Sequence, residues 1–365
     1  MAQSPSRAAR SHRSACRRLI VTMLGFACLA ASLAACGKAA NSRGQVSLLP
    51  SAAAKGKSWD WTPACPRGPD SPSGCAAAGP VLGPAQLTAN EWNLGVGQGT
   101  PDSVNMSVGP TGGLKVNANL TSAPPCTAAT CIAREANTWV RGYPSISYGI
   151  DQCHAKTSPP QSPDLRLPAR VDAIPDDLVG RATYDAQASQ VTYDVAYDIW
   201  LSSSGTKTPC QTDGTLEVMV WTDYDARALL PDGLKVGTAT VPFAVDGAFK
   251  SGDQAWSVYV NNVYGAGHTA PWGGTVWLVP NVGDATKRGT VSVDLSAALA
   301  AVGTLLQTKY GWGSFARTYW LDTIAFGMEF GPDNGDPYGD GPTDFSLDLR
   351  SYCLLVGTTV PAATC

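Results

Sequence analysis

The sequence predicts an all-β fold, an antiparallel sandwich with one helix packed on its outside. Short stretches in which apolar and polar residues alternate recur along the chain, and turn residues separate them. The 365 residues include 38 Gly, 27 Pro and 11 Trp, and 44% of all residues are apolar. Many strands and turns suit this composition better than long helices do. The length allows one large domain or two modest ones.

The N-terminus has the parts of an export signal. A basic stretch, RAARSHRSACRR, precedes a short apolar run that ends in LAAC, Leu33–Cys36. A run this short behind a basic front is typical of a signal peptide, and LAAC resembles a bacterial lipobox. We expect residues 1–35 to be removed and Cys36 to be lipidated. The chain would then be anchored to the outer face of the bacterial cell membrane, or secreted if the signal is an ordinary one.

The next segment, 36–80, is expected to be a tether. Residues 37–58 are rich in Ala, Ser, Gly and Lys, which is typical of a flexible linker. Residues 59–80 are rich in Pro, Gly and Cys, so we expect an irregular segment held by disulfides. The sandwich domain would occupy residues 81–365.

Within that domain, ten stretches alternate as strands do, with successive side chains on opposite faces. Turn residues separate them at spacings that favour an antiparallel sandwich. We expect strands at 113–120, 138–143, 182–186, 190–202, 216–222, 235–243, 255–263, 274–281, 322–331 and 345–354.

One segment departs from this pattern, between Val293 and Gly311. Its apolar residues recur at the spacing of one helix face, which predicts a helix. Asp294 or Ser296 is expected to cap the start of the helix, and Gly311 to end it. The apolar positions are Leu295, Leu299, Val302, Leu305 and Leu306.

Eight cysteines remain after export and lipidation. An even number in an exported protein indicates disulfides, although sequence does not fix the pairing. Proximity favours 65–75, 126–131 and 353–365, which leaves 153–210. A metal site is the alternative, but only His154 and His268 remain as histidine ligands and there is no CxxC. The cysteines are Cys65, Cys75, Cys126, Cys131, Cys153, Cys210, Cys353 and Cys365.

Composition and motifs argue against several classes of function. The net charge is about −3, only 15% of residues are charged, and no basic run follows the N-terminal segment. A nucleic-acid partner is therefore not expected. The sequence has no GxGxxG or GxxxxGK pattern for a nucleotide, and no GxSxG for a serine hydrolase.

Carboxylates in the middle of apolar strands are the unusual feature of this sequence. In TLEVMVW, Glu217 shares a strand face with Met219 and Trp221, while the other face looks like ordinary core. In the stretch 190–202, Asp198 likewise shares a face with Trp200. A carboxylate beside an aromatic ring, in a chain poor in charge, suggests a cleft.

Two further acidic residues belong to the same pattern. Asp194 shares the face of Asp198, but it is expected nearer the strand end and therefore in contact with water. In TIAFGMEFG, Glu329 has Gly327 and Gly331 on its face, and glycine inside a strand often marks a close approach by another group. That group could be a ligand.

Two carboxylates on opposite walls of a sugar-binding cleft are what hydrolysis of a glycosidic bond needs. One gives a proton to the leaving oxygen, and the other attacks or stabilises the anomeric carbon, so their pKa values must differ. The alternative for each carboxylate is a place on a solvent-facing sheet surface.

Five motifs, in the right order, resemble glycoside hydrolase family 12. EVMVW (217–221) resembles the Glu-x-Met-x-Trp strand that carries the nucleophile, and YDIWL (197–201) resembles the strand before it. GMEFG (327–331) resembles a Gly-x-Glu motif near the C-terminus. NEW (90–92) and RGYPSISYG (141–149) resemble two segments that line the cleft.

The resemblance covers residues from about 85 to 355, with some departures. Asn93 stands where the family usually has Gly, and Phe330 where Pro or Ala is more usual. Segments 97–131 and 268–274 look like insertions. These differences bear on the choice of substrate more than on the reaction.

The resemblance implies a two-sheet antiparallel β-jelly-roll sandwich with a concave substrate cleft. It implies endo-acting, retaining hydrolysis of β-1,4-glucosidic bonds in cellulose-like, mixed-linkage or xyloglucan chains. It implies no cofactor, a polysaccharide as the partner and a monomeric state.

The same resemblance assigns roles to particular residues. Glu217 would be the nucleophile and Glu329 the acid/base, with their carboxyls roughly 5–5.5 Å apart for retention. Asp198 would support Glu217, by sharing a hydrogen bond with it. The sugar subsites would be lined by Asn90, Trp92, Met219 and Trp221.

Other interpretations stay open. A non-catalytic glycan-binding jelly roll would keep the cleft without turnover, although the retained carboxylates argue against it. Another β-linked polysaccharide, such as xylan, would keep the chemistry and change the substrate. The Asp-rich stretch 331–344 has oxygen ligands suited to calcium, but Gly, Pro, Asp and Asn are also the residues of any long turn.

Overall fold

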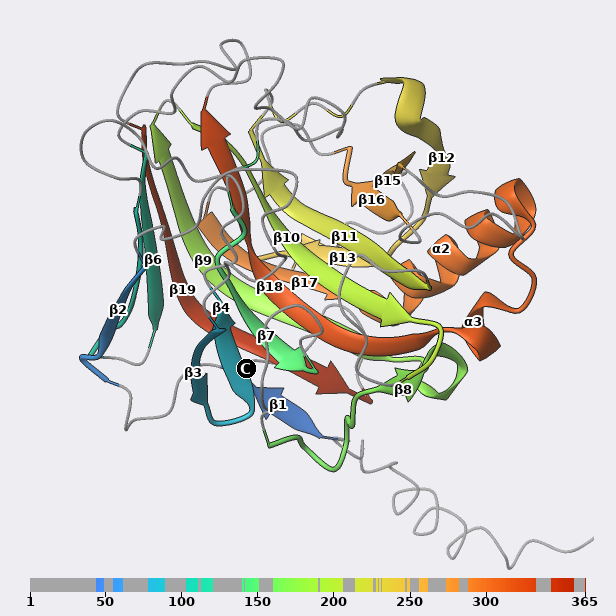
Figure 1. Cartoon of the computed structure of the whole chain (residues 1–365), viewed down its shortest axis with the longest axis horizontal. Coiled ribbons are helices and arrows are strands. Elements are labelled where there is room, and N and C mark those ends of the chain that lie inside the picture. The colour runs from blue at the N-terminus through green and yellow to red at the C-terminus, as the bar shows by residue number, and fades with distance from the viewer. Residues whose placement is uncertain are drawn as a thin grey trace, which may run out of the picture. The chain divides into compact units, whose positions relative to one another are not determined.

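Two large sheets form the sandwich that the sequence predicts (Figure 1). The structure is a computed structural model, and the residues it describes all belong to one unit, 42–365. The described residues are 44–48, 55–61, 78–88, 103–110, 113–120, 140, 142–150, 160–189, 191–205, 214–225, 228, 230, 232–246, 248–249, 256–261, 274–281, 288–332, 343–357 and 365.

The first sheet has nine strands among these residues. Its order is β14-β13-β17-β9-β19-β6-β5-β2, and β1 pairs with β19. The strands are β1 (Gln45–Ser47), β2 (Ser58–Trp61), β5 (Ser103–Val108), β6 (Leu114–Leu120), β9 (Leu178–Ser189), β13 (Phe243–Val245), β14 (Ala248–Phe249), β17 (Arg288–Asp294) and β19 (Thr343–Val356).

The second sheet has ten described strands in the order β12-β15-β16-β11-β10-β18-β7-β4-β3, and β8 pairs with β18. All its pairs are antiparallel except β11 with β16. The strands are β3 (Ala78–Leu82), β4 (Ala85–Thr88), β7 (Ser145–Gly149), β8 (Ala169–Arg170), β10 (Val191–Ser202), β11 (Thr215–Tyr224), β12 (Lys235–Ala239), β15 (Trp256–Asn261), β16 (Thr275–Val279) and β18 (Trp320–Pro332).

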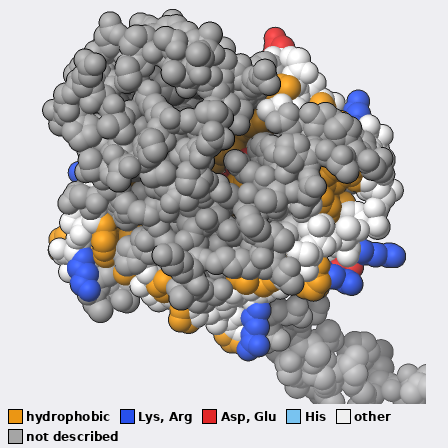
Figure 2. Space-filling model, in the orientation of Figure 1, with side chains coloured by type: hydrophobic (Ala, Val, Ile, Leu, Met, Phe, Trp, Pro, Cys, Tyr) orange, Lys and Arg blue, Asp and Glu red, His pale blue; other side chains and the backbone are white. Residues whose placement is uncertain are grey.

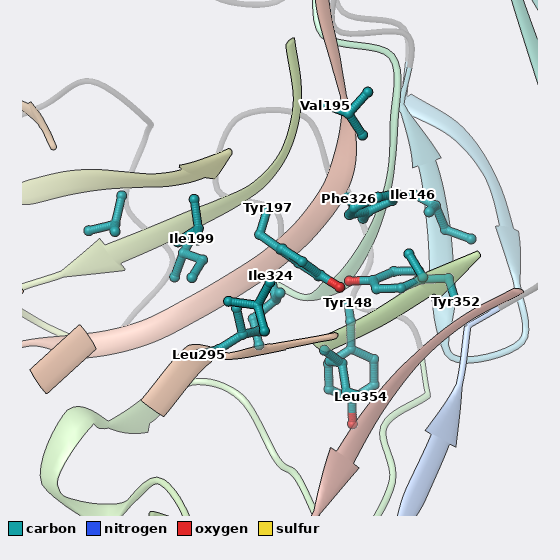
Figure 3. Close-up of a cluster of buried hydrophobic side chains, with 14 of the residues drawn as sticks. Ile146, Tyr148, Val195, Tyr197, Ile199, Leu295, Ile324, Phe326, Tyr352 and Leu354 are labelled. Atoms are coloured by element: carbon teal, nitrogen blue, oxygen red, sulfur yellow. The ribbon is translucent and has the colours of Figure 1, made fainter. Parts of the chain in front are cut away.

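The core lies between the two sheets, as alternation predicts. The ring of Tyr197 on β10 lies 4.9 Å from that of Phe326 on β18, and Phe326 lies 5.3 Å from Tyr352 on β19. Figure 3 shows these rings meeting between the sheets, with Leu295 of the helix nearby. Each ring buries a large apolar area, so this contact holds the two sheets together.

The predicted helix is confirmed as α2 (Leu295–Tyr310). Asp294 is its N-cap, with its side chain accepting a hydrogen bond from the amide of Ala297 at 2.8 Å. Gly311 ends the helix in the left-handed region, at φ 71°, where glycine carries no steric cost. Of the predicted apolar face, Leu295, Leu299, Val302 and Leu306 are buried. A shorter helix, α3 (Phe315–Thr318), follows α2.

Several strands lie where the sequence did not predict them. β1 and β2 lie in the segment expected to be a tether, yet β1 pairs with β19 and β2 with β5. The strands β3, β4, β5, β7, β8, β14 and β17 were also missed. These nine strands have two to seven residues each, so their alternation is weak, and several of them, such as β1, β2 and β17, pair with strands far away in sequence.

Two predicted strands are corrected. Residues 235–243 form two strands, β12 and β13, because the chain passes from one sheet to the other at 240–242. In 138–143, the described residues form no strand, and only Gly142 makes a bridge, to Phe330.

The predicted disulfide between Cys353 and Cys365 is confirmed. It fastens the C-terminal residue to β19, a central strand of the nine-stranded sheet. The other predicted pairs lie outside the described residues. Among the helices that the structure describes, none has the length and apolar character needed to cross a membrane.

The cap of α2 gives a test of this fold. Replacing Asp294 by Ala removes the side-chain acceptor and is expected to lower the free energy of unfolding by about 0.5–2 kcal/mol. Asp294→Asn keeps an acceptor and should lose clearly less. Chemical denaturation of the two variants checks this, and equal losses would contradict the capping role.

Candidate active site

Strand register brings the predicted carboxylates onto one face of the ten-stranded sheet. Residues directly opposite each other on paired strands point to the same face. Trp200 on β10 lies opposite Glu217 on β11, and Asp194 on β10 lies opposite Glu329 on β18. Asp198 lies between them on the same strand face. We call this face, turned away from the core, the carboxylate face.

Glu217 is half-buried, and its nearest described partner is a threonine. Thr275 lies opposite it on β16 and donates a hydrogen bond from Oγ1 to Glu217 Oε2 at 2.7 Å. A donor of this kind stabilises the ionised carboxylate. Sequence reasoning missed Thr275, because nothing in the sequence indicates that β16 runs beside β11 in parallel.

Asp198 is only 4% exposed and is held by its neighbour on the strand. Trp200 Nε1 donates to Asp198 Oδ2 at 2.9 Å. The pairing of these two residues on one face was predicted, and the hydrogen bond explains it. The predicted hydrogen bond between Asp198 and Glu217 stays a prediction.

The expectation that Asp194 contacts water was wrong. Instead of lying in water near a strand end, it is completely buried, with 0% exposure, and Glu329 opposite it is 5% exposed. Alternation along a strand predicts the face but not the depth, because depth depends on what covers that face. The segment that carries Tyr143 lies close to both carboxyls.

Burial sets the charge state of this pair. Desolvation raises the pKa of Glu329 well above its ordinary value, and the charges of Asp194, Glu217 and Asp198 raise it further. Desolvation also raises the pKa of Asp194, to about 8. Since Glu217 acts electrostatically on both, the four carboxyl groups form one cluster although they come from three strands.

The glycine beside Glu329 marks a close approach, as predicted, but what approaches it is the protein's own backbone. A Cβ atom on Gly327 would collide with the carbonyl oxygen of Pro144 and with Ser145. This segment also carries Tyr143, whose buried hydroxyl donates to the carbonyl oxygen of Ala196 at 3.0 Å. Glycine here lets the segment lie against the acidic cluster.

An apolar cluster occupies the rest of the carboxylate face. Met219 and Trp221, predicted to line sugar subsites, are on this face but only 2% and 1% exposed. Their contact with a sugar stays a prediction. Trp277 on β16 lies opposite Met219, and Tyr259 on β15 lies opposite Trp277. These two rings were missed, because their place depends on strand order.

The remaining predicted residues fall outside the described part of the chain. They are Asn90, Trp92, the lipidation residue Cys36, and most of the Asp-rich stretch 331–344. Among the residues that are described, no three His, Cys, Asp or Glu side chains gather as a metal site.

Figure 2 shows an acidic side chain in a hollow near the centre of the face in view, beside hydrophobic side chains.

Comparison with known proteins gives a family match over part of the chain. The family model of glycosyl hydrolase family 12 matches residues 112–279. The matched segment is just under half of the chain and includes Asp194, Asp198 and Glu217, while Glu329 lies beyond it. The match supports assignment to a family of glycoside hydrolases. No curated protein matches the chain in sequence.

Matches to solved structures cover most of the chain. The native family 12 xyloglucanase from Bacillus licheniformis has a TM-score of 0.51 and 17% identity, and the match covers 82% of this chain and all (100%) of that one. At this identity the similarity shows the fold, a jelly-roll sandwich. Other matches are a metagenome-derived family 12 endoglucanase (TM-score 0.47, 19% identity, 81% and 100% covered) and endoglucanase cel12A from Rhodothermus marinus (0.45, 18%, 80% and 99%).

The close approach at Gly327 can be tested by adding the missing carbon. Gly327→Ala is expected to destabilise the protein by about 1–3 kcal/mol, because backbone atoms of 144–145 must move. Gly237→Ala, also within a strand, meets no atom within 4 Å and serves as the control. Thermal unfolding of both variants is the measurement, and equal melting temperatures would contradict the contact.

Proposed function

We propose that this chain is a family 12 glycoside hydrolase that cleaves β-1,4-glucosidic bonds within glucan chains, with retention of configuration. The observation that carries the proposal is the arrangement of Glu217 and Glu329. They come from the two strands that flank β10, share one sheet face, and act on each other electrostatically. A pair of carboxyls in different environments is what the reaction requires.

Glu217 suits the role of nucleophile. It is the more exposed of the two glutamates and accepts a hydrogen bond from Thr275, which favours its ionised form. Its carboxylate would attack the anomeric carbon and form a glycosyl–enzyme bond, while the bond to the leaving oxygen breaks. Asp198, fixed by Trp200, would orient Glu217 and maintain the local negative potential.

Glu329 suits the role of acid/base. Because its pKa is raised, it keeps its proton to a higher pH than an ordinary glutamate, and that proton is available to the leaving oxygen. After departure of the leaving group, the same carboxylate would take a proton from the water that hydrolyses the intermediate. Activity is then expected to fall as pH rises and Glu329 ionises.

The substrate is proposed to be a soluble or accessible β-1,4-glucan. Similar structures include a xyloglucanase and endoglucanases, so cellulose-like, mixed-linkage and xyloglucan chains are the candidates. No cofactor is needed for this mechanism. The enzyme is proposed to act as a monomer outside the cell, where polysaccharides are met.

The two glutamates are tested by isosteric replacement. Glu217→Gln and Glu329→Gln are each expected to lower hydrolysis of barley β-glucan, carboxymethyl cellulose and xyloglucan by about 100- to 10,000-fold. Release of reducing sugar measures the rate, and NMR of the first product shows whether its anomer is retained. Leu234→Met is the control variant. Leu234 is not part of the carboxylate face, so this variant is expected to keep the wild-type rate.

Either glutamate would lose its assigned role if its Gln variant kept the wild-type rate on every substrate that the protein cleaves. A wild-type protein that binds these glucans without cleaving them would instead favour the glycan-binding alternative. An inverted product would contradict the retaining mechanism alone.

The N-terminal pattern is proposed to place the enzyme on the outer face of the cell membrane. The full-length chain with Cys36→Ser is expected to move from the membrane fraction to the soluble fraction, because it lacks the residue that would carry the lipid. Cys16→Ser, in the segment that would be removed, is the matched control. Unchanged partition of Cys36→Ser would contradict lipidation.

A further inference from the structure

A row of small residues crosses the carboxylate face beside its buried acidic pair. Ala196 on β10 lies opposite Gly327 on β18, next along that face from the pair of Asp194 and Glu329. On the other side of β18, Gly327 lies opposite Ser145 of β7. None of these residues has a large side chain to cover the strands, so the row leaves room for a group that comes from elsewhere.

Tyr143 occupies this row. It precedes β7, which lies on the side of β18 away from β10 (Figure 1). Its hydroxyl nevertheless donates to the carbonyl oxygen of Ala196 on β10 at 3.0 Å, so the side chain spans β18. Alternation places it on the face of Ser145, whereas Ile146 belongs to the core between the sheets. The ring therefore crosses on the carboxylate face, over Gly327.

The backbone around Tyr143 is held against the sheet. Gly142 forms a bridge to β18, and the carbonyl oxygen of Pro144 lies where a Cβ atom of Gly327 would be. Val140 belongs to the apolar cluster of the carboxylate face. Between these contacts, Tyr143 is only 2% exposed. Its ring is thus a fixed part of the site.

The strand register sets Tyr143 level with Glu329. Gly142 bridges Phe330 and Ser145 pairs with Gly327, so the residue between them lies beside the acid/base candidate. Burial raises the pKa of the tyrosine well above its ordinary value, and the negative charges around it raise that pKa further. The hydroxyl therefore keeps its proton, and its hydrogen bond, over the whole range in which the carboxyls titrate.

We propose that Tyr143 is a positioning residue whose ring, anchored on the Ala196 carbonyl, excludes water from the β7 side of Glu329 and keeps this acid/base protonated. This inference rests on the proposed function. The proton that Glu329 gives to the leaving oxygen is then present when the glucan binds. Tyr143 itself neither gives nor takes a proton in the reaction.

The direction of the effect follows from what acts on Glu329. Desolvation is the largest cause of its raised pKa, followed by the charges of Asp194, Glu217 and Asp198. Glu217 lies on β11 and the two aspartates on β10. Water admitted in place of the ring would hydrate the Glu329 carboxylate and screen these charges, and both changes lower the pKa. Glu329 would then lose its proton, and the enzyme its activity, at a lower pH.

Removing the ring tests the proposal. Tyr143→Ala is expected to move the alkaline limb of kcat/KM on barley β-glucan to lower pH by about one unit. Tyr143→Phe keeps the ring and loses only the anchor, so its limb should move by less than half as much. If Tyr143→Ala does not fold, Tyr143→Leu gives the same test, because leucine is also too short to span β18.

Two matched variants control for a loss of stability alone. Tyr319→Ala removes a ring that stacks on Trp312, and Tyr148→Phe removes a tyrosine hydroxyl that donates to the carbonyl oxygen of Leu165. Both residues lie outside the carboxylate face, so each variant should lower the melting temperature and leave the alkaline limb in place. A purely structural role for Tyr143 predicts the same of its own variants. An unmoved limb in Tyr143→Ala, a shift to higher pH, or equal shifts in Tyr143→Ala and Tyr143→Phe would each overturn the proposal.

A second readout does not depend on activity. In the chain labelled with ¹³C at the Glu carboxyls, the signal that disappears in Glu329→Gln identifies Glu329. This signal is expected to titrate above the ordinary range in the wild type and closer to that range in Tyr143→Ala. An ordinary titration in the wild type, or the same titration in both proteins, would contradict the role of Tyr143. A wild-type protein that cleaves no glucan but shows the expected difference would refute the proposed function and leave the exclusion of water by Tyr143 standing.

Discussion

The register of β11 and β18 against β10 is the constraint on which the site depends. Because side chains alternate along a strand, a slip of one residue would move either glutamate into the core and replace it with an apolar neighbour. The core face prevents such a slip. Tyr197 and Phe326 pack on each other and on Tyr352 of the other sheet, and exposing these rings would remove a large apolar area from the core. The packing that holds the sandwich together thus also sets the alignment of the carboxylates.

The carboxylate face concentrates acidic groups where water is scarce. Burying a carboxylate is costly unless it is hydrogen-bonded or protonated, and the described residues show both solutions. Trp200 donates to Asp198 and Thr275 donates to Glu217, while burial raises the pKa of Glu329 and Asp194. Carboxyl groups whose pKa values are raised by burial are typical of acid–base sites, whereas a sheet surface exposed to water would leave a carboxyl group with its ordinary pKa.

Much of the fold followed from local pattern, and the errors have a common cause. Long strands such as β10 and β18 were predicted because apolar and polar residues alternate over many positions. The helix α2 was predicted because the spacing of its apolar residues and its capping residues can be recognised in the sequence. β1 and β2 have only a few residues each, and they are strands because β19 and β5 supply their hydrogen-bonding partners. Pairing between distant segments cannot be seen in a short stretch of sequence.

The sequence by itself determined which residues share a strand face, and hence that Glu217, Asp198 and Glu329 each sit beside small or aromatic neighbours. It also determined the helix α2, since spacing and capping are local properties. The tertiary structure decided which strands lie side by side, and therefore that Thr275 meets Glu217 and that Asp194 meets Glu329. It also decided depth: alternation places Asp194 on a face, but only the packing over that face removes the water and raises the pKa of the side chain.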